Sequence, residues 1–274
     1  MKTLAAWIVG ALGALSLATG AHAQDCKPAH EFETMTPGVI THVLVSYMPY
    51  DALDNAGKAI GVDGDILNEI AKMECLQLKS TSVDASAALN YVVSGRADIA
   101  SGSYYRTAAR AKVLALSDPL YIDQMGMVSR AGYDSIPQII GKKVGSVPGD
   151  LWIADLRRLD VDLKLYPALP ELLQDMRLGR IDAALVGYSV TIMAKEKGQM
   201  DGLVAKVAKP DKRVAASVSP GQGSFPMSMG NPAMVEAINA DIAVLKKNGF
   251  IAKTLEKYDL DVSAAKTGAP RLIQ

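Results

Sequence analysis

The chain is poor in histidine and in aromatic residues, and it has no excess of charge of either sign. Among 274 residues it has 3 His, 5% aromatic residues, and 29 basic against 29 acidic side chains. Scarce imidazole leaves little material for a Ser-His-acid triad. Zero net charge without basic clusters argues against a nucleic-acid partner. An apolar content of 49% also excludes low-complexity disorder, so a folded globular protein is expected.

Long hydrophobic runs are also missing beyond the N-terminus. At the N-terminus itself, the segment from Leu4 to Ala18 is apolar apart from two Gly and one Ser. Lys2 precedes this segment, and Ala21-His22-Ala23 follows it as a small-x-small cleavage site. The run is too short for a membrane span and has the layout of a secretory signal. The charge placement and the cleavage site argue against the alternative, a buried helix. We therefore predict export, cleavage after Ala23 and a soluble mature chain that begins at Gln24.

That mature chain contains two cysteines, Cys26 and Cys75. Because disulfides persist outside the cytoplasm, we predict that the two are joined, across 49 residues of sequence. The chain-entropy model assigns such a bond about 4 kcal/mol of stability. The alternative is a lipid anchor at Cys26, but Asp25 does not fit the position before a lipidated cysteine. His30 and His42 are not in metal-ligand spacing with the cysteines, so no metal site is predicted.

Strand and helix patterns alternate along the chain. Val39 to Tyr47 alternates and is rich in β-branched residues, which predicts a strand. Gly61-Val62-Asp63-Gly64 then leads into a helix whose apolar face contains Ile66, Leu67, Ile70 and Ala71. Near the C-terminus, Asn231-Pro232 predicts an N-cap followed by proline at the first helical position. That helix is expected to end at Gly249, a second helix to cover 250–258, and the chain after it to be loose.

One pattern occurs twice, 84 residues apart: a helix, then Gly-Arg-x-Asp, then a strand. The apolar helix faces contain Leu89, Val92 and Val93 in the first copy, and Leu172, Leu173 and Met176 in the second. Gly95 and Gly179 are expected to end these helices as glycines in the left-handed conformation. Asp98 and Asp182 are expected to form hydrogen bonds at strand ends rather than to act as acid and base. The repetition predicts two similar α/β lobes.

Catalytic motifs are missing from the sequence: it has no phosphate loop, no dinucleotide-binding glycine pattern and no nucleophile elbow. Instead, Tyr104-Tyr105-Arg106 directly follows the first Gly-Arg-x-Asp strand, and Arg110 comes four residues later. Loops at strand ends bind ligands in open α/β sheets. Arginine matches a carboxylate with two parallel donors, and tyrosine offers a flat apolar face with a polar tip. These residues are candidate ligand contacts; the alternative is that the arginines lie on the surface and the tyrosines in the core.

Five motifs in order, between about Val39 and Tyr258, resemble the periplasmic solute-binding proteins of polar amino-acid ABC transporters, solute-binding family 3. They are Asp63-Gly64-Asp65-Ile66-Leu67; Gly95-Arg96-Ala97-Asp98 with Thr107-Ala108-Ala109-Arg110; Leu116-Ser117-Asp118-Pro119-Leu120-Tyr121; Gly141-Lys142-Lys143-Val144-Gly145-Ser146-Val147-Pro148-Gly149; and Lys246-Lys247-Asn248-Gly249 with Lys257-Tyr258. Each motif alone is weakly specific, but their order is typical of the family.

The resemblance implies the type II periplasmic-binding-protein fold, an α/β architecture of two lobes joined by two crossing strands with the ligand cleft between them. After the signal peptide (1–23), it implies a first lobe of 24–123 plus 216–258, a second lobe of 124–215, and a C-terminal tail of 259–274. Hinges are expected near 122–124 and 215–219, where the chain passes between the lobes.

The resemblance also implies site residues. Arg110 corresponds to the arginine that binds the ligand carboxylate, Tyr47 to an aromatic that stacks on the ligand, and Tyr105 to a residue that contacts its head group. Leu151 is expected to offer a backbone N–H at a helix N-terminus. Arg106 is a second cation near the site, which faces either an acidic ligand group or a protein carboxylate.

Two positions depart from the family pattern. Ala85 stands where many relatives have a second stacking aromatic, and Gly187 where many have the aspartate that holds the ligand's α-amino group. Tyr188, Asp51, Asp123 and Asp150 are the candidate replacements for that aspartate, and the sequence does not rank them.

The resemblance implies a monomeric, cofactor-free periplasmic protein that captures a small carboxylate-bearing ligand and delivers it to the membrane permease of an ABC transporter. An amino acid or a related compound is the expected ligand. Two alternatives remain at this point: a periplasmic enzyme on the same fold, similar to cyclohexadienyl dehydratases, and a sensing or accessory protein that binds without transport.

Overall fold

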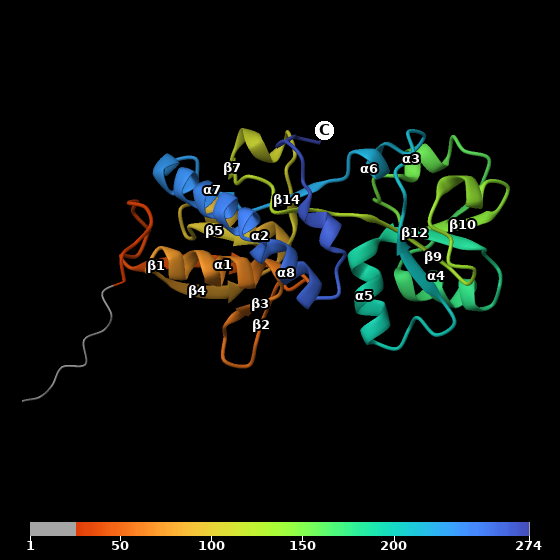
Figure 1. The fold of residues 1–274 in the computed structure, drawn as a ribbon, viewed down its shortest axis with the longest axis horizontal. Helices are drawn as coiled ribbons and strands as arrows, with labels where there is room; N and C mark the ends of the chain where they lie inside the picture. The colour runs from red at the N-terminus through yellow and green to blue at the C-terminus, as the bar shows by residue number, and fades with distance from the viewer. Residues whose placement is uncertain (1–25, 274) are drawn as a thin grey trace, which may run out of the picture.

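The computed structural model describes residues 26–273, so the signal sequence and the cleavage at Ala23 lie outside the described residues. Two five-stranded sheets stand in two separate bodies (Figure 1). The first sheet has the order β4-β1-β5-β15-β7 and is formed by β1 (Val39–Leu44), β4 (Gln77–Ser82), β5 (Ile99–Ser101), β7 (Ala115–Leu116) and β15 (Pro226–Met227). The second has the order β11-β10-β12-β9-β13 and is formed by β9 (Met125–Ser129), β10 (Lys143–Ser146), β11 (Asp162–Leu165), β12 (Ala183–Gly187) and β13 (Val204–Val207).

Helices cover both faces of each sheet. In the first lobe, α1 (Val62–Met73), α7 (Pro232–Lys247) and α8 (Phe250–Lys257) pack on one face, and α2 (Ala85–Val93) packs on the other. In the second lobe, α3 (Ile153–Leu156) and α6 (Ala215–Val218) pack on one face, and α4 (Leu169–Arg177) and α5 (Tyr188–Glu196) on the other. Burial on both faces fits the largely apolar parallel strands at the centre of each sheet. The predicted two-lobed α/β fold is confirmed.

Two stretches of chain connect the lobes. The first leaves the small sheet formed by β6 (Tyr104–Tyr105), β8 (Tyr121–Ile122) and β14 (Gln222–Ser224) and enters β9. The second returns from α6 to β14. Ala216 packs in the core of the second lobe together with Val214. We therefore propose that the return crossing lies at 219–221, a few residues after the boundary at 216 that the resemblance implies.

The repeated Gly-Arg-x-Asp motif forms the same local structure in both lobes. Gly95 and Gly179 have φ angles of 66° and 71°, the left-handed conformation that favours glycine at a helix end. The Asp98 backbone N–H donates to the Thr41 carbonyl at 2.8 Å, and its carboxylate accepts the Thr41 N–H at 2.8 Å. Asp182 makes the same two bonds to Lys143, at 2.8 and 2.9 Å. Each aspartate therefore stands at the start of its own strand and bonds to the neighbouring strand, which fits the predicted role at strand ends.

Other sequence predictions have mixed outcomes. The apolar faces of α1 and α4 are buried as expected, and the Asn231 side chain caps α7 by accepting the Met234 N–H at 3.1 Å. Val93 was predicted to lie on the buried face of α2, but it is 55% exposed because it occupies the last position of that short helix.

The C-terminal tail is ordered, which corrects the expectation of a loose segment. A 3₁₀ turn covers Val262–Ala265. The Gln222 side chain donates to the Thr267 carbonyl at 2.8 Å and accepts the Arg271 N–H at 2.9 Å. The Ile273 N–H donates to the Arg106 carbonyl at 2.9 Å. These backbone contacts hold the tail on the first lobe without the apolar periodicity that sequence analysis looks for. Within residues 26–273, none of the helices has the length and apolar character to cross a membrane.

Cys26 and Cys75 form the predicted disulfide, with their Cα atoms 5.7 Å apart. The bond fixes the N-terminal segment to the end of α1. We expect thiol titration of the denatured, non-reduced protein to find no free thiol, and titration after reduction to find two. Two reactive thiols before reduction would contradict the pairing.

Candidate functional site

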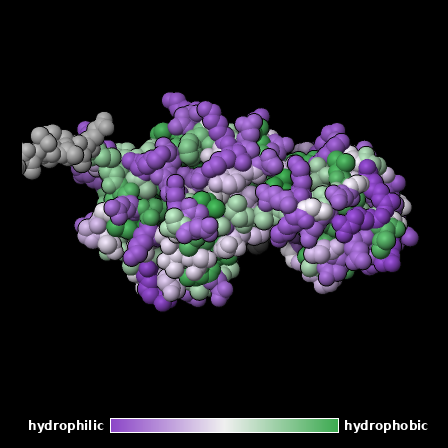
Figure 2. Space-filling view, turned by 90° about the horizontal axis from the view of Figure 1, so that it is seen from below, coloured by the Kyte–Doolittle hydropathy of each residue, from purple (hydrophilic) through white to green (hydrophobic). Residues whose placement is uncertain are grey.

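A cavity of about 270 Å³ lies between the two lobes. Figure 2 shows the molecule narrowing between its two bodies at this level. The first lobe contributes Tyr47 and Tyr105, the crossing chains contribute Asp123, Pro220 and Gly221, and the second lobe contributes the rest, which includes Gly149, Asp150, Leu151, Trp152, Gly187 and Val190. A larger hollow of about 690 Å³ beside Glu31 and Asn231 is lined by the first lobe alone. A second interlobe hollow, lined by Ser46 and Met48 and by Pro170 and Met193, shares Tyr47 with the smaller cavity, so a movement of the lobes would change both.

Asp123 is one of two aspartates that line this cavity, and it directly follows β8 at the start of the crossing chain. Its Oδ2 accepts a short hydrogen bond from the Tyr105 hydroxyl. Its Oδ1 is buried and has no hydrogen-bond partner. Burial raises the pKa of Asp123, and the hydroxyl groups of Tyr105 and Tyr50 oppose that rise. A buried acceptor without a donor is costly, so this oxygen is prepared for a donor from a ligand.

Gly187 lies directly beside Asp123. A Cβ atom added at Gly187 would be 3.9 Å from Asp123 Oδ2 and 4.0 Å from Oδ1. The Asp123 carboxylate therefore occupies the space next to the position where many relatives have their aspartate. Of the replacements that the sequence left open, Asp123 and Asp150 line the cavity, whereas Asp51 and Tyr188 do not.

The tyrosines of the first lobe are anchored in its core. The Tyr47 side chain is 40% exposed at the cavity, and its ring stacks on Tyr50 with centroids 5.8 Å apart. Tyr50 in turn stacks on buried Tyr121 at 4.8 Å. A Cβ at Gly221 would come within 3.2 Å of the Tyr105 ring, so glycine permits the close approach of the crossing chain there. Both predicted aromatic contacts therefore border the cavity.

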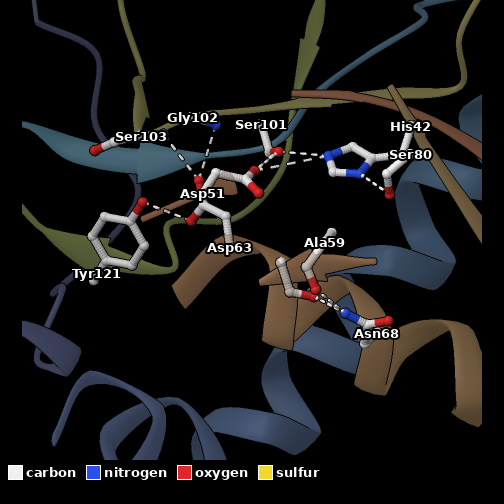
Figure 3. Close-up of polar contacts among 11 residues, drawn as sticks. His42, Asp51, Ala59, Asp63, Asn68, Ser80, Ser101, Gly102, Ser103 and Tyr121 are labelled. Carbon is white, nitrogen blue, oxygen red and sulfur yellow. Dashed lines mark hydrogen bonds and ion pairs between the residues drawn. The ribbon is translucent and has the colours of Figure 1, made fainter. Parts of the chain in front are cut away.

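A network of buried polar side chains lies inside the first lobe (Figure 3). His42 lies 2.9 Å from Ser80 Oγ and 2.5 Å from Ser101 Oγ, and the Ser101 hydroxyl donates to Asp51. Asp63 accepts the Tyr121 hydroxyl at 2.7 Å. Burial lowers the pKa of His42 to about 3 and raises the pKa of Asp51 well above its usual range. Burial therefore disfavours the charged form of both groups, and neither of them lines the interlobe cavity.

The two arginines have different surroundings. Arg110 begins a 3₁₀ turn, its Nη1 donates to the Tyr105 carbonyl at 2.7 Å, and its guanidinium lies 5.0 Å from the centre of the Tyr104 ring. Among residues 26–273, no carboxylate lies within ion-pair distance of this guanidinium. Arg110 does not itself line the cavity, but it is held beside the backbone of Tyr105, which does.

Arg106 is directed to the first lobe's own backbone. Its Nη1 donates to the Leu116 carbonyl at 2.9 Å and to the Ser117 carbonyl. The cavity lining does not include Arg106. The hydrogen bonds of this side chain therefore go to carbonyl groups, and the nearby Asp118 carboxylate raises its pKa, against the effect of burial.

Of the second-lobe residues Leu151, Trp152 and Tyr188, the first two line the cavity and Tyr188 does not. Leu151 borders the cavity and is 46% exposed, but it lies in a turn before α3, which begins at Ile153 and has only 4 residues. The contribution of this short helix's N-terminus to anion binding is therefore small. Trp152 also lines the cavity and donates to Ser146 Oγ at 3.0 Å. Tyr188 lies outside the cavity and packs against the core of the first lobe.

Comparisons with known proteins agree with this geometry. The L-cystine-binding protein TcyJ of Escherichia coli (strain K12) is 26% identical over 221 residues, which covers 78% of this chain and 79% of that protein. The histidine-binding periplasmic protein of Salmonella typhimurium is 23% identical over 232 residues, which covers 79% and 86%. Substrate-binding domain 2 of Lactococcus lactis GlnP, in an open conformation, is similar with a TM-score of 0.67 and 25% identity, over 83% of this chain and 98% of that domain.

The family comparison extends over most of the chain. The model of bacterial extracellular solute-binding proteins, family 3, matches residues 39–261, which include both sheets, both crossings and the cavity. The chain belongs to the bacterial extracellular solute-binding proteins, family 3.

Proposed function

We propose that this protein captures a free amino acid between its lobes, in the periplasm and as a monomer, and delivers it to the permease of an ABC transporter. The observation that carries the proposal is the unpartnered, buried oxygen of Asp123 in the interlobe cavity. Names of relatives support the ligand class, because they include binding proteins for cystine, arginine and histidine.

The charges around the cavity suit a zwitterion. Asp123 lines the cavity and offers an acceptor for the α-amino group. Arg110 lies behind the lining, on the Tyr105 carbonyl, and offers the α-carboxylate a cation that has no protein carboxylate as partner among the described residues. Burial lowers the pKa of Arg110, and an anionic partner would favour its charged form. Tyr47 and Tyr105 provide apolar faces beside them. A ligand with both charges would satisfy both groups, whereas a plain acid or a plain amine would leave one unpaired.

A thermal-shift screen tests the proposal. Amino acids are compared with the matching 2-oxo acids and amines, which lack one of the two charged groups. An amino acid present at about 100 times its Kd should stabilise the folded protein by about 2.7 kcal/mol, because it binds only the folded state. Neither single-charge analogue should match it. A 2-oxo acid that stabilises as strongly as its amino acid would contradict the amino-acid assignment.

An enzyme on the same fold is the competing function. Its support is Asp150, a carboxyl group in the cavity whose pKa burial raises to about 6, which is suitable for a general acid. We propose that the cavity binds without chemistry, because the relatives found are binding proteins. Incubation with prephenate or arogenate should leave both unchanged; formation of an aromatic product would show an enzyme.

Trp152 should report on binding in the cavity. Removal of the signal sequence takes away Trp7 and leaves Trp152 as the single tryptophan of the mature chain. Its indole is 5% exposed and lines the cavity, so closure of the lobes changes its surroundings. We expect tryptophan emission to change with ligand concentration and to give the same Kd as calorimetry. A stabilising ligand that leaves the emission unchanged would indicate binding elsewhere.

A further inference from the structure

Three potential metal ligands meet on the first lobe, away from the interlobe cavity. His30 comes from the N-terminal segment, Glu74 from the C-terminal end of α1, and Asp241 from α7. Their ligand atoms all lie within 4.8 Å of one another. His30 Nδ1 is 2.6 Å from Glu74 Oε1 and 3.6 Å from Asp241 Oδ1. The cavity lining includes none of the three.

Asp241 is the feature of this cluster that its protein neighbours do not explain. The residue is completely buried, and neither of its carboxylate oxygens has a hydrogen-bond partner. The Glu74 side chain is also buried, at 1% exposure, although it accepts the His30 backbone N–H at 2.9 Å. A protonated His30 would balance only one of two buried carboxylates. A buried carboxylate needs a counter-charge or a proton, so either a second cation or a proton shared with Glu74 must neutralise this pair.

We propose that His30, Glu74 and Asp241 bind one divalent transition-metal ion of the zinc type, which fastens the N-terminal segment to α1 and α7. A divalent ion would balance both carboxylates and leave the imidazole neutral, the form that binds metal. One imidazole nitrogen with two carboxylate oxygens and an open fourth position is a ligand set that zinc accepts. The imidazole disfavours magnesium and calcium, which take oxygen ligands.

One of the ligand spacings, that between His30 and Asp241, is close to what the ion requires. Ligand atoms about 2.1 Å from a tetrahedral zinc lie roughly 3.4 Å apart, near the 3.6 Å between His30 and Asp241. The His30–Glu74 contact would lengthen from its present hydrogen-bond distance. His30 is 35% exposed and belongs to a segment at the surface, which gives the ion an entry path. The neighbouring Cys26–Cys75 disulfide keeps this segment at the end of α1, so the site is largely formed before the ion arrives.

The test uses the exported, disulfide-bonded protein after chelation and dialysis. Zinc titrated into it by calorimetry should bind at one ion per chain and raise the unfolding temperature. Mutation of a residue that only orients a metal ligand typically weakens metal binding by roughly tenfold to a hundredfold. Because His30→Ala and Asp241→Asn remove the ligands themselves, each should weaken zinc binding by more than that. Glu31→Gln is the matched control, since Glu31 is an exposed carboxylate next to His30 and should leave zinc binding unchanged. His30 is partly exposed, so its variant remains informative if Asp241→Asn folds poorly.

A shared proton is the rival counter-charge, because burial and the Glu74 carboxylate raise the pKa of Asp241. In that case the wild-type protein takes up no zinc at micromolar concentrations, and Asp241→Asn stabilises it; this result would overturn the proposal. Zinc binding that is unchanged in both ligand variants would also overturn it, because the ion would then be elsewhere. Amino-acid affinity should be the same with and without zinc, so failure here is separate from failure of the proposed function.

Discussion

Arg110→Ala is expected to weaken amino-acid binding by a hundredfold or more while leaving the protein folded. Arg110 is half-buried, is held by the Tyr105 carbonyl at 2.7 Å, and has no carboxylate partner among the described residues. Removal of one member of a buried charge pair costs about 3–5 kcal/mol, and each 1.4 kcal/mol is about tenfold in affinity. Isothermal titration calorimetry of the variant against wild type measures the effect.

Arg106→Ala is the matched control for this prediction. It removes a neighbouring arginine of the same chemistry, but one whose guanidinium donates to the Leu116 and Ser117 carbonyls of its own lobe. We expect it to lower the unfolding temperature and to change ligand affinity by much less than Arg110→Ala. Near wild-type affinity in Arg110→Ala would show that another group binds the carboxylate. An equal loss in both variants would indicate a general effect of the β6 region.

The features that the sequence predicts well are those determined by neighbouring residues. Helix faces, the glycines at 95 and 179, and the Asn231 cap depend on local backbone geometry, which a periodic pattern reports directly. The strand-end role of Asp98 and Asp182 is also predictable, because the motif places each aspartate just before a strand. The two-lobed fold then follows from repetition of one local unit.

The features that the sequence does not predict depend on residues distant in the chain. Nothing near Asp123 distinguishes it from Asp51 or Asp150, and only the fold places it beside Gly187 while burying Asp51 in a hydrogen-bonded network. The C-terminal tail is held by the side chain of Gln222 and by the backbone of the β6 region, which have no apolar period. His30, Glu74 and Asp241 are likewise too far apart in sequence to form a spacing motif.

Asp123→Asn should change which ligands bind rather than abolish binding altogether. The amide keeps an oxygen to accept the Tyr105 hydroxyl, so the local structure is retained, but the negative charge is lost. Loss of one member of a buried charge pair again costs about 3–5 kcal/mol, so amino-acid affinity should fall a hundredfold or more. The matching 2-oxo acid, which has no amino group, should lose little. Titrations of both ligands measure this selectivity, and Asp150→Asn is the control carboxylate in the same cavity.

The most specific test places a carboxylate at position 187 in the protein that lacks the Asp123 charge. Gly187 has a φ of −56°, which any L-residue adopts, and its added Cβ would be 3.9 Å from the Asp123 carboxylate. Gly187→Asp alone brings two carboxylates together, and like charges at that distance disfavour ionisation of both. In the double variant Asp123→Asn/Gly187→Asp, a single carboxylate again faces the amino group, so amino-acid affinity should recover by at least about tenfold over Asp123→Asn. If Asp123→Asn binds amino acids as wild type does, or if Asp150→Asn alone loses them, Asp123 is not the group that replaces the family's aspartate.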